Sequence, residues 1–184
     1  MMFDDILARI AIELKKADLP YMIIGGQAVL LYGTPRMTKD IDITLGVDIG
    51  FLEDILPSLD AMDLKIIPED YKTFAEKTYV LPTKDETSGI RVDFIFSFTP
   101  YERQAISNSR AVLLKGTNVM FASAEDVIIH KIFAGRPRDL EDVRSILLKT
   151  PELDREYIRK WLSEFEKSPD KKGLTKIFDD VLTD

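Results

Sequence analysis

Apolar residues recur along the 184-residue chain with two different periods, which predict short strands separated by amphipathic helices. Residues 3–17, for example, carry apolar side chains at helical spacing and end in two lysines shortly before a proline. The pattern predicts strands over residues 21–24, 40–45, 64–67, 77–81, 90–96, 111–114 and 118–121. It predicts helices over residues 3–17, 27–32, 51–62, 138–149, 154–166 and 170–182, one that starts at Tyr101, and one from a Ser123 cap to Ala134.

The order of these elements predicts an α/β (α+β) fold of two parts. Strands and helices alternate in residues 1–122, and only helices follow in residues 123–184. The strands at 77–81 and 90–96 are predicted to form a hairpin around a polar turn at 83–89. We expect the helical C-terminal region to complete a cleft beside the sheet.

Composition narrows the functional class. The chain contains no cysteine, which excludes thiolate chemistry, and its formal charge of −7 argues against a general nucleic-acid coat. No apolar run approaches membrane-spanning length, and the first residues are acidic where a signal peptide would be basic. We therefore expect a cytoplasmic protein that does not engage a membrane.

A pair of acids interrupts the apolar strand at residues 40–45. Because side chains alternate along a strand, Asp40 and Asp42 point the same way, about 6.5 Å apart, while Ile41 and Ile43 face the core. Holding two like charges in such a strand is costly unless a cation lies between them. Carboxylates at this spacing suit one or two Mg²⁺ ions, which keep substrate phosphates among their ligands.

Asp93 is the candidate for a third carboxylate, which would hold a second ion and accept the nucleophile's proton. It lies in an otherwise apolar and aromatic run, Val92 to Phe96, where a lone acid needs a partner. The alternative is an ion pair with Arg36 or Arg91. Arg36 itself, in the loop before the acidic pair, is placed either to orient a carboxylate or to touch a phosphate.

Gly25 and Gly26 stand between the predicted strand 21–24 and the helix 27–32. The free N–H groups at a helix start favour phosphate, and the glycine pair precedes the acids by only a short loop. Both features could therefore contact one triphosphate. Tight strand-to-helix turns also use glycine for backbone reasons alone.

These residues resemble the nucleotidyltransferase superfamily that includes DNA polymerase beta. The resemblance rests on Gly25-Gly26, thirteen intervening residues, Asp40-x-Asp42 and a later strand acid, Asp93. It implies a nucleotidyltransferase fold, with a small, mixed, twisted sheet flanked by helices. Residues 1–122 would be the catalytic domain, and residues 123–184 would complete the nucleotide cleft.

A later segment resembles AbiEii-like proteins, the nucleotidyltransferase-type toxins of bacterial toxin–antitoxin systems and their relatives. It spans residues 123–143 and contains Lys131 and Arg138-Asp139-x-x-Asp142. The resemblance covers about residues 20–147. By resemblance, the metal ligands would be Asp40, Asp42 and Asp93, and the nucleotide would be contacted through Gly25, Gly26, Thr38 and Lys131, with Asp139 and Asp142 beside the cleft.

The charged residues of the segment 123–143 can also be explained without a nucleotide. Lys131 lies on an apolar helix face, from which its stem could simply extend to solvent. Asp139 and Asp142 fall in the first turns of a helix, where the dipole favours acids anyway. Arg136 and Arg138 would either steer an anionic substrate or pair with those acids.

The implied reaction is Mg²⁺- or Mn²⁺-dependent transfer of a nucleoside monophosphate from an NTP to an acceptor hydroxyl. The acceptor would be an RNA 3′ end, a protein hydroxyl or a small molecule such as an aminoglycoside, and an antitoxin is a possible partner. One departure is Gly26, where the superfamily often has serine. The alternative is a non-catalytic module that binds a nucleotide or a partner with the same fold.

Three ring-bearing residues remain. The single histidine, His130, has no nucleophile beside it in sequence and is expected on the surface or in the core. Trp161 is expected in the core of the last helices. Tyr101 is expected to pack at its helix start, although an aromatic near a cleft could stack on a base.

Overall fold

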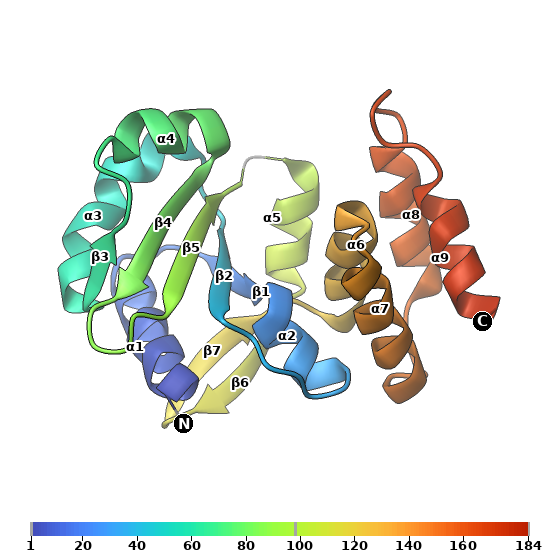
Figure 1. Ribbon diagram of the computed structural model, residues 1–184, viewed down its shortest axis with the longest axis horizontal. Coiled ribbons are helices and arrows are strands. Elements are labelled where there is room, and N and C mark those ends of the chain that lie inside the picture. The colour runs from blue at the N-terminus through green and yellow to red at the C-terminus, as the bar shows by residue number, and fades with distance from the viewer. Residues whose placement is uncertain (1, 98, 184) are drawn as a thin grey trace.

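A computed structural model describes residues 2–97 and 99–183, and in this part of the chain seven strands form one mixed sheet in the order β3-β4-β5-β2-β1-β7-β6 (Figure 1). The strands are β1 (Tyr21–Ile24), β2 (Asp40–Leu45), β3 (Leu64–Ile66), β4 (Val80–Asp85), β5 (Arg91–Phe96), β6 (Arg110–Leu114) and β7 (Thr117–Phe121). The pairs β1–β7 and β2–β5 are parallel, and the other neighbours are antiparallel. The predicted mixed sheet is confirmed.

Strand β2 lies at the centre of the sheet and buries its isoleucines on one face. Ile41 and Ile43 are fully buried, whereas Asp40 is exposed and Asp42 is partly exposed on the other face. β1 pairs with β2 on one side and β5 on the other. Both neighbours are therefore in position to present side chains beside the acidic pair.

Helices cover the sheet and extend beyond it. They are α1 (Met2–Lys16), α2 (Gly25–Tyr32), a 3₁₀ turn (Ile49–Phe51), α3 (Leu52–Ala61), α4 (Tyr71–Thr78), α5 (Pro100–Ser107), α6 (Ala124–Ala134), α7 (Pro137–Lys149), α8 (Arg155–Phe165) and α9 (Leu174–Thr183). α1 packs against β6, β7 and α3, whereas α2 packs against β1, β2, α6 and α7. The helices from α6 to α9 form a group beside the sheet (Figure 1).

The predicted strand 77–81 and turn 83–89 are wrong in position. Residues 71–78 form α4, whose start is capped by the Asp70 side chain and whose end is the left-handed Tyr79. β4 then begins at Val80 and runs to Asp85, antiparallel to β5. The predicted hairpin partner is correct, but its first strand starts three residues later than expected.

Buried polar residues explain this error. Thr83 and Asp85 look like turn residues in the sequence, yet both are buried in β4. The Thr83 hydroxyl donates to the Val92 carbonyl, and Asp85 accepts hydrogen bonds from Arg9 and Ser88. Partners distant in sequence thus satisfy polar groups that local reasoning assigns to solvent.

The C-terminal helices form as expected, with small shifts at their ends. The predicted cap of α6 is confirmed, because Ser123 Oγ accepts from the Asp126 backbone N–H, and Gly135 ends the helix in the left-handed conformation. Among the described residues, no helix has the length and apolar character needed to cross a membrane.

Candidate active site

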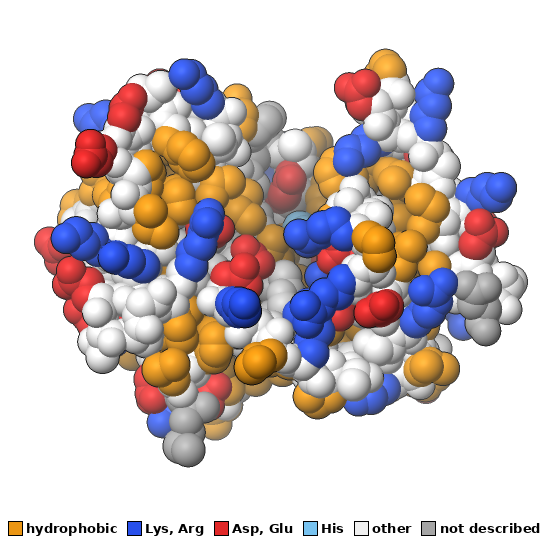
Figure 2. All heavy atoms as spheres, viewed as in Figure 1, with side chains coloured by type: hydrophobic (Ala, Val, Ile, Leu, Met, Phe, Trp, Pro, Cys, Tyr) orange, Lys and Arg blue, Asp and Glu red, His pale blue; other side chains and the backbone are white. Residues whose placement is uncertain are grey.

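Three acidic residues share one face of the central strands. Asp40 and Asp42 are two residues apart on β2, and the parallel register places Asp42 beside Asp93 on β5 and opposite Ile24 on β1. Figure 2 shows acidic and basic side chains facing each other near the middle of one face, where the molecule is hollowed between its two halves. The three predicted carboxylates are thus brought together by the sheet.

The pKa of Asp42 is strongly raised in this group of acids. Burial raises the pKa of Asp42 to about 6, and the neighbouring charges of Asp40 and Asp93 contribute to the rise. Lys131 and Arg136 act in the opposite direction and lower it. A cation placed beside Asp42 would relieve the repulsion among the three acids.

The Asp93 carboxylate is held by Arg91 in this structure. Arg91 Nε lies 2.8 Å and 3.0 Å from the two carboxylate oxygens of Asp93, two residues along the same strand face. Asp40 is the register partner of Arg91 on β2. Of the two pairing partners considered from the sequence, the structure therefore has Arg91 and not Arg36.

Gly25 is required by the close approach of Asp42. Its φ of +63° lies in the left-handed region, and a Cβ atom at this position would overlap the Asp42 carboxylate. The backbone at the start of α2 consequently lies directly against the acid. The glycine pair forms the first turn of α2 instead of a loop before it, so the helix starts two residues earlier than predicted.

Gly26 and Thr38 are similarly close. A Cβ on Gly26 would lie 2.5 Å from Thr38 Cγ2. Thr38 Oγ1 accepts a hydrogen bond of 2.6 Å from the side chain of Gln27. Gln27 is buried, and a polar residue in the apolar run of α2 is the sequence signal by which its role could have been found.

Lys131 lies at the centre of a buried ionic cluster. Its Nζ is 2.7 Å from Asp139 Oδ1 and 2.9 Å from Asp142 Oδ2, and the Lys131 side chain is only 7% exposed. Arg36 binds Asp142 with two parallel hydrogen bonds of 2.8 Å. Arg36 is therefore paired with a carboxylate, that of Asp142, and its predicted role in the site stays a prediction.

The acids of this cluster remain ionised. Burial alone would raise the pKa of Asp142, but hydrogen bonds from Arg36 and Lys131 outweigh it and leave the pKa below its ordinary value. The pKa of Asp139 is likewise lowered, against burial, by hydrogen bonds from Arg136 and Lys131. Arg136 Nε lies 2.6 Å from Asp139, whereas Arg138 is exposed on α7.

The donor set suits a hard divalent ion in type. Asp40, Asp42 and Asp93 offer carboxylate oxygens, the ligands that Mg²⁺ and Mn²⁺ prefer. Among residues 2–97 and 99–183, no three acidic or histidine side chains converge tightly enough to hold a metal as they stand. Release of Asp93 by Arg91 would free the third carboxylate for such an ion.

A cavity of about 900 Å³ adjoins the acidic face. Its floor includes Ile24, Thr44 and Ile95, and its walls come from α5, α6, α8 and the segment after α8. The sequence interpretation did not include Thr44. The available signal was its position two residues beyond Asp42, which places it on the same strand face.

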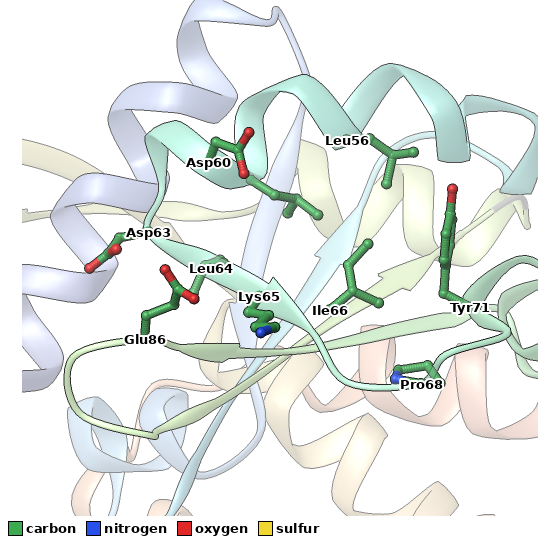
Figure 3. A pocket seen from close by; sticks show the side chains of 10 residues that line it. Leu56, Asp60, Asp63, Leu64, Lys65, Ile66, Pro68, Tyr71 and Glu86 are labelled. Atoms are coloured by element: carbon green, nitrogen blue, oxygen red, sulfur yellow. The ribbon is translucent and has the colours of Figure 1, made fainter.

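A second cavity, of about 660 Å³, lies beside the edge strand β3 (Figure 3). Leu56 of α3, Ile66 of β3 and Tyr71 of α4 line one end of it, and charged side chains including Lys65 and Glu86 lie toward the other. None of the three acids of the central strands lines this cavity.

Comparison with known proteins gives one family. A family model described as nucleotidyl transferase AbiEii toxin, type IV TA system, matches residues 5–182. No curated protein matches the chain in sequence.

Two solved structures share the fold over nearly the whole chain. An antigenic nucleotidyltransferase-like protein from Paracoccidioides brasiliensis is 18% identical, with 95% of this chain and 92% of that chain covered and a TM-score of 0.59. ANT(2″)-Ia in complex with adenylyl-2″-tobramycin is 16% identical, with 91% and 98% covered and a TM-score of 0.61. At these identities the likeness shows the nucleotidyltransferase fold.

Proposed function

Because the chain belongs to the AbiEii family of nucleotidyltransferases, we propose that it transfers a nucleoside monophosphate from an NTP to an acceptor hydroxyl. The acceptor oxygen forms a bond to the α-phosphorus, the bond to the β-phosphate breaks, and pyrophosphate leaves. The observation that carries this proposal is Asp42, flanked by Asp40 and Asp93 and packed directly against the first turn of α2.

The three acids would hold Mg²⁺ or Mn²⁺ in this reaction. When bound, such ions neutralise phosphate charge and lower the pKa of an attacking hydroxyl. Asp40 and Asp42 are proposed as ligands, and Asp93 as the ligand that also receives the nucleophile's proton. Arg91 must leave Asp93 for this, and a negatively charged phosphate gives its guanidinium an alternative partner.

The proposed phosphate contacts lie at the start of α2. Gly25 and Gly26 leave the backbone uncovered there, so N–H groups and the positive end of the helix dipole can approach the triphosphate. Thr38 Oγ1 accepts from Gln27, which leaves its hydroxyl proton available to a phosphate oxygen.

The ionic cluster is proposed to shape the field of the site. Lys131 and Arg136 stabilise the ionised form of Asp42, so their charges act across the cleft. Lys131 contacts both Asp139 and Asp142 and is buried, which supports a long-range electrostatic role more than a direct phosphate contact. Arg36, also bound to Asp142, is proposed to act in the same way.

A second candidate function is a nucleotide-binding module without turnover. The Arg91–Asp93 ion pair favours it, because a permanently occupied Asp93 would leave only two carboxylates for metal. The intact set of three acids favours the enzyme. An antitoxin is proposed as a partner on the family's description alone.

A labelling assay tests the proposal. The purified protein is incubated with each α-labelled NTP, Mg²⁺, and either total RNA, total protein or tobramycin, the aminoglycoside whose adenylyl product is bound to ANT(2″)-Ia. We expect label in one of these acceptors and its loss when EDTA is added. Binding of NTP and Mg²⁺, seen as a raised melting temperature, with no label in any arm would instead support the second candidate.

A further inference from the structure

The edge strand β3 has one side that no other strand of the described sheet covers. It is the last strand in the strand order and pairs antiparallel with β4. The backbone oxygen of Asp63 and the backbone N–H of Ile67 form hydrogen bonds toward β4 and the residue after it. Backbone groups in an antiparallel pair alternate in direction, so the N–H and C=O groups of Leu64 and Ile66 point away from β4. Such a row of outward groups is a template for a further strand.

The cavity of about 660 Å³ lies along this side of β3 (Figure 3). Leu64 and Ile66, whose backbone groups point outward, both line it. Leu56 and Leu59 of α3 and Tyr71 of α4 line it as well, which makes one end apolar. An extended segment paired with β3 would therefore find space for its side chains against α3.

The other end of the cavity is acidic. Asp60 of α3, Asp63 and Glu86 line it together with one cation, Lys65. The Asp63 carboxylate lies 3.9 Å from Arg9, which is bound more closely by a carboxylate of β4. Asp60 and Glu86 are exposed. Three acids against one lysine give this end a net negative charge, which favours a cationic side chain.

Strand β3 also has features that discourage pairing with an arbitrary strand. It is only three residues long, Lys65 stands at its centre, and Pro68 follows shortly after it. Natural sheets protect their edges with short strands, lysine and proline of this kind. A partner for β3 must therefore gain more than backbone hydrogen bonds, and the apolar and acidic ends of the cavity supply that selectivity.

We propose that this cavity binds an extended, basic segment of a partner protein, which adds a strand to β3. Its backbone would pair with the outward groups of Leu64 and Ile66. A large apolar side chain would pack against Leu56 and Tyr71, and a lysine or arginine would face Asp60. Both side chains lie on the α3 side, so an even number of residues separates them along the segment. The proposal does not rest on nucleotidyl transfer, because the acids of the central strands do not line this cavity.

Other occupants fit these features less well. The acids repel a nucleic acid or an anionic membrane surface, and a free polyamine would use neither the apolar end nor the outward backbone groups. A second copy could offer β6, the other edge strand, in which Arg110, Val112 and Leu114 share a face. A contact of β3 with β6 is head to tail, however, and would build open filaments instead of a closed oligomer.

A synthetic peptide tests the proposal on the full chain. The probe is a fluorescently labelled, C-terminally amidated peptide, Ser-Lys-Thr-Val-Thr-Ile-Ser, in which the lysine, valine and isoleucine share one face. We expect saturable binding in fluorescence anisotropy, with a Kd of about 1 mM or tighter. The same peptide with glutamate in place of lysine should bind at least about threefold more weakly. No binding of the lysine peptide up to about 5 mM would overturn the proposal.

Two N-methylated forms of the lysine peptide test backbone pairing. Each carries methyl groups on alternate amides, so one form blocks the amides that face β3 and the other blocks those that face away. We expect one form to bind at least about tenfold more weakly and the other to bind within about twofold of the parent peptide. Equal binding of the two forms, or displacement of the parent peptide by spermidine at equal concentration, would overturn strand addition.

Asp60→Asn tests the acidic end of the cavity. The variant should bind the lysine peptide roughly threefold more weakly and leave binding of the glutamate peptide unchanged or stronger. Asp54→Asn is the matched control, because Asp54 is also an exposed acid of α3 but does not line the cavity. Its binding of both peptides should equal that of wild type. Equal effects of the two variants would contradict a role of the cavity in recognising the lysine.

Ile66→Pro tests the strand edge from the side of the protein. It removes an N–H that points away from β4, and proline is tolerated at such an edge position. We expect the variant to fold and to bind both peptides at least about fivefold more weakly. The N-methylated peptides provide the same test if the variant does not fold. If wild type forms oligomers in sedimentation and Ile66→Pro dissociates them, the occupant is a second copy and the proposal is overturned.

Discussion

The carboxylate of Asp42 occupies the space into which a side chain on residue 25 would extend. A side chain at residue 25 would be strained by the left-handed backbone and would overlap the carboxylate, so glycine here serves both the turn and the acid. The sequence indicated the glycine pair and the acids as one constellation. Their direct contact could not be predicted, because it depends on the exact entry of the chain from β1 into α2.

His130 provides a prediction on pH at the residue scale. Its folded-state pKa of about 4 lies below the ordinary value of about 6.5. Between about pH 6.5 and pH 4, the unfolded chain therefore binds a proton at His130 and the folded protein does not. Protonation therefore favours unfolding, and stability falls as the pH decreases through this window. Between pH 7.5 and 5.0 this residue should account for roughly 2 kcal/mol of lost stability.

The measurement is urea unfolding of wild type and His130→Leu at the two pH values. Asp42 has the opposite effect on stability, because its raised pKa makes the folded protein bind a proton before the unfolded chain does as the pH falls toward 4. The His130 contribution is therefore read from the difference between variant and wild type. Equal losses of stability in both proteins would contradict the assignment of a buried neutral imidazole.

At the scale of elements, α6 and α7 are joined to the loop before β2 by the buried ionic cluster of Arg36, Lys131, Asp139 and Asp142. Arg36 and Asp142 are 106 residues apart in the chain, yet they form the bidentate pair at the centre of this contact. The sequence motif indicated these acids but left open whether they served the helix dipole, a phosphate or a cation. Only their tertiary neighbours distinguish these roles.

The cluster predicts a large effect of Asp142→Ala on stability. Removing this carboxylate leaves Arg36 and Lys131 without a shared partner in a largely buried site, which should cost about 3–5 kcal/mol. Asp179→Ala is the matched control, because the Arg159–Asp179 pair is much more exposed, at 39% and 49%. This control should change the unfolding free energy by less than about 1 kcal/mol in the same chemical denaturation experiment. Similar effects for the two variants would refute a stabilising role for the cluster.

Elements with strong local signals were predicted well. β1 and β2 have the predicted bounds, since β1 is a short apolar run closed by glycine and β2 alternates acidic and apolar residues before it ends at Gly46. The helix α4 was not predicted and β4 was displaced, because Thr83 and Asp85 are polar in sequence but satisfied by distant partners in the fold. Local propensity could not reveal those partners.

At the scale of the whole molecule, the site arises from segments distant along the chain. The sheet supplies the acids, the start of α2 supplies bare backbone, and α5, α6 and α8 supply the aromatic walls (Figure 1). The sequence predicted the first two contributions from motifs. It predicted the third only in part: it expects the C-terminal helices to complete a cleft and Tyr101 to pack or to stack on a base. His130 and Trp161 carry no motif, and they join Tyr101 only when the C-terminal helices pack beside the sheet.

The central claim is that the carboxylates of β2 and β5 perform metal-dependent nucleotidyl transfer, and Asp42→Asn tests it most directly. The variant keeps the shape of the side chain and removes one of three repelling charges, so it should fold with an unchanged or higher melting temperature at pH 7.5. In the Mg²⁺-dependent labelling assay, we expect transfer to fall at least about a hundredfold, a loss of transition-state stabilisation of roughly 2.7 kcal/mol. Glu141→Gln, an exposed acid on α7, should retain wild-type transfer. A folded Asp42→Asn protein that transfers nucleotide at the wild-type rate would contradict the account.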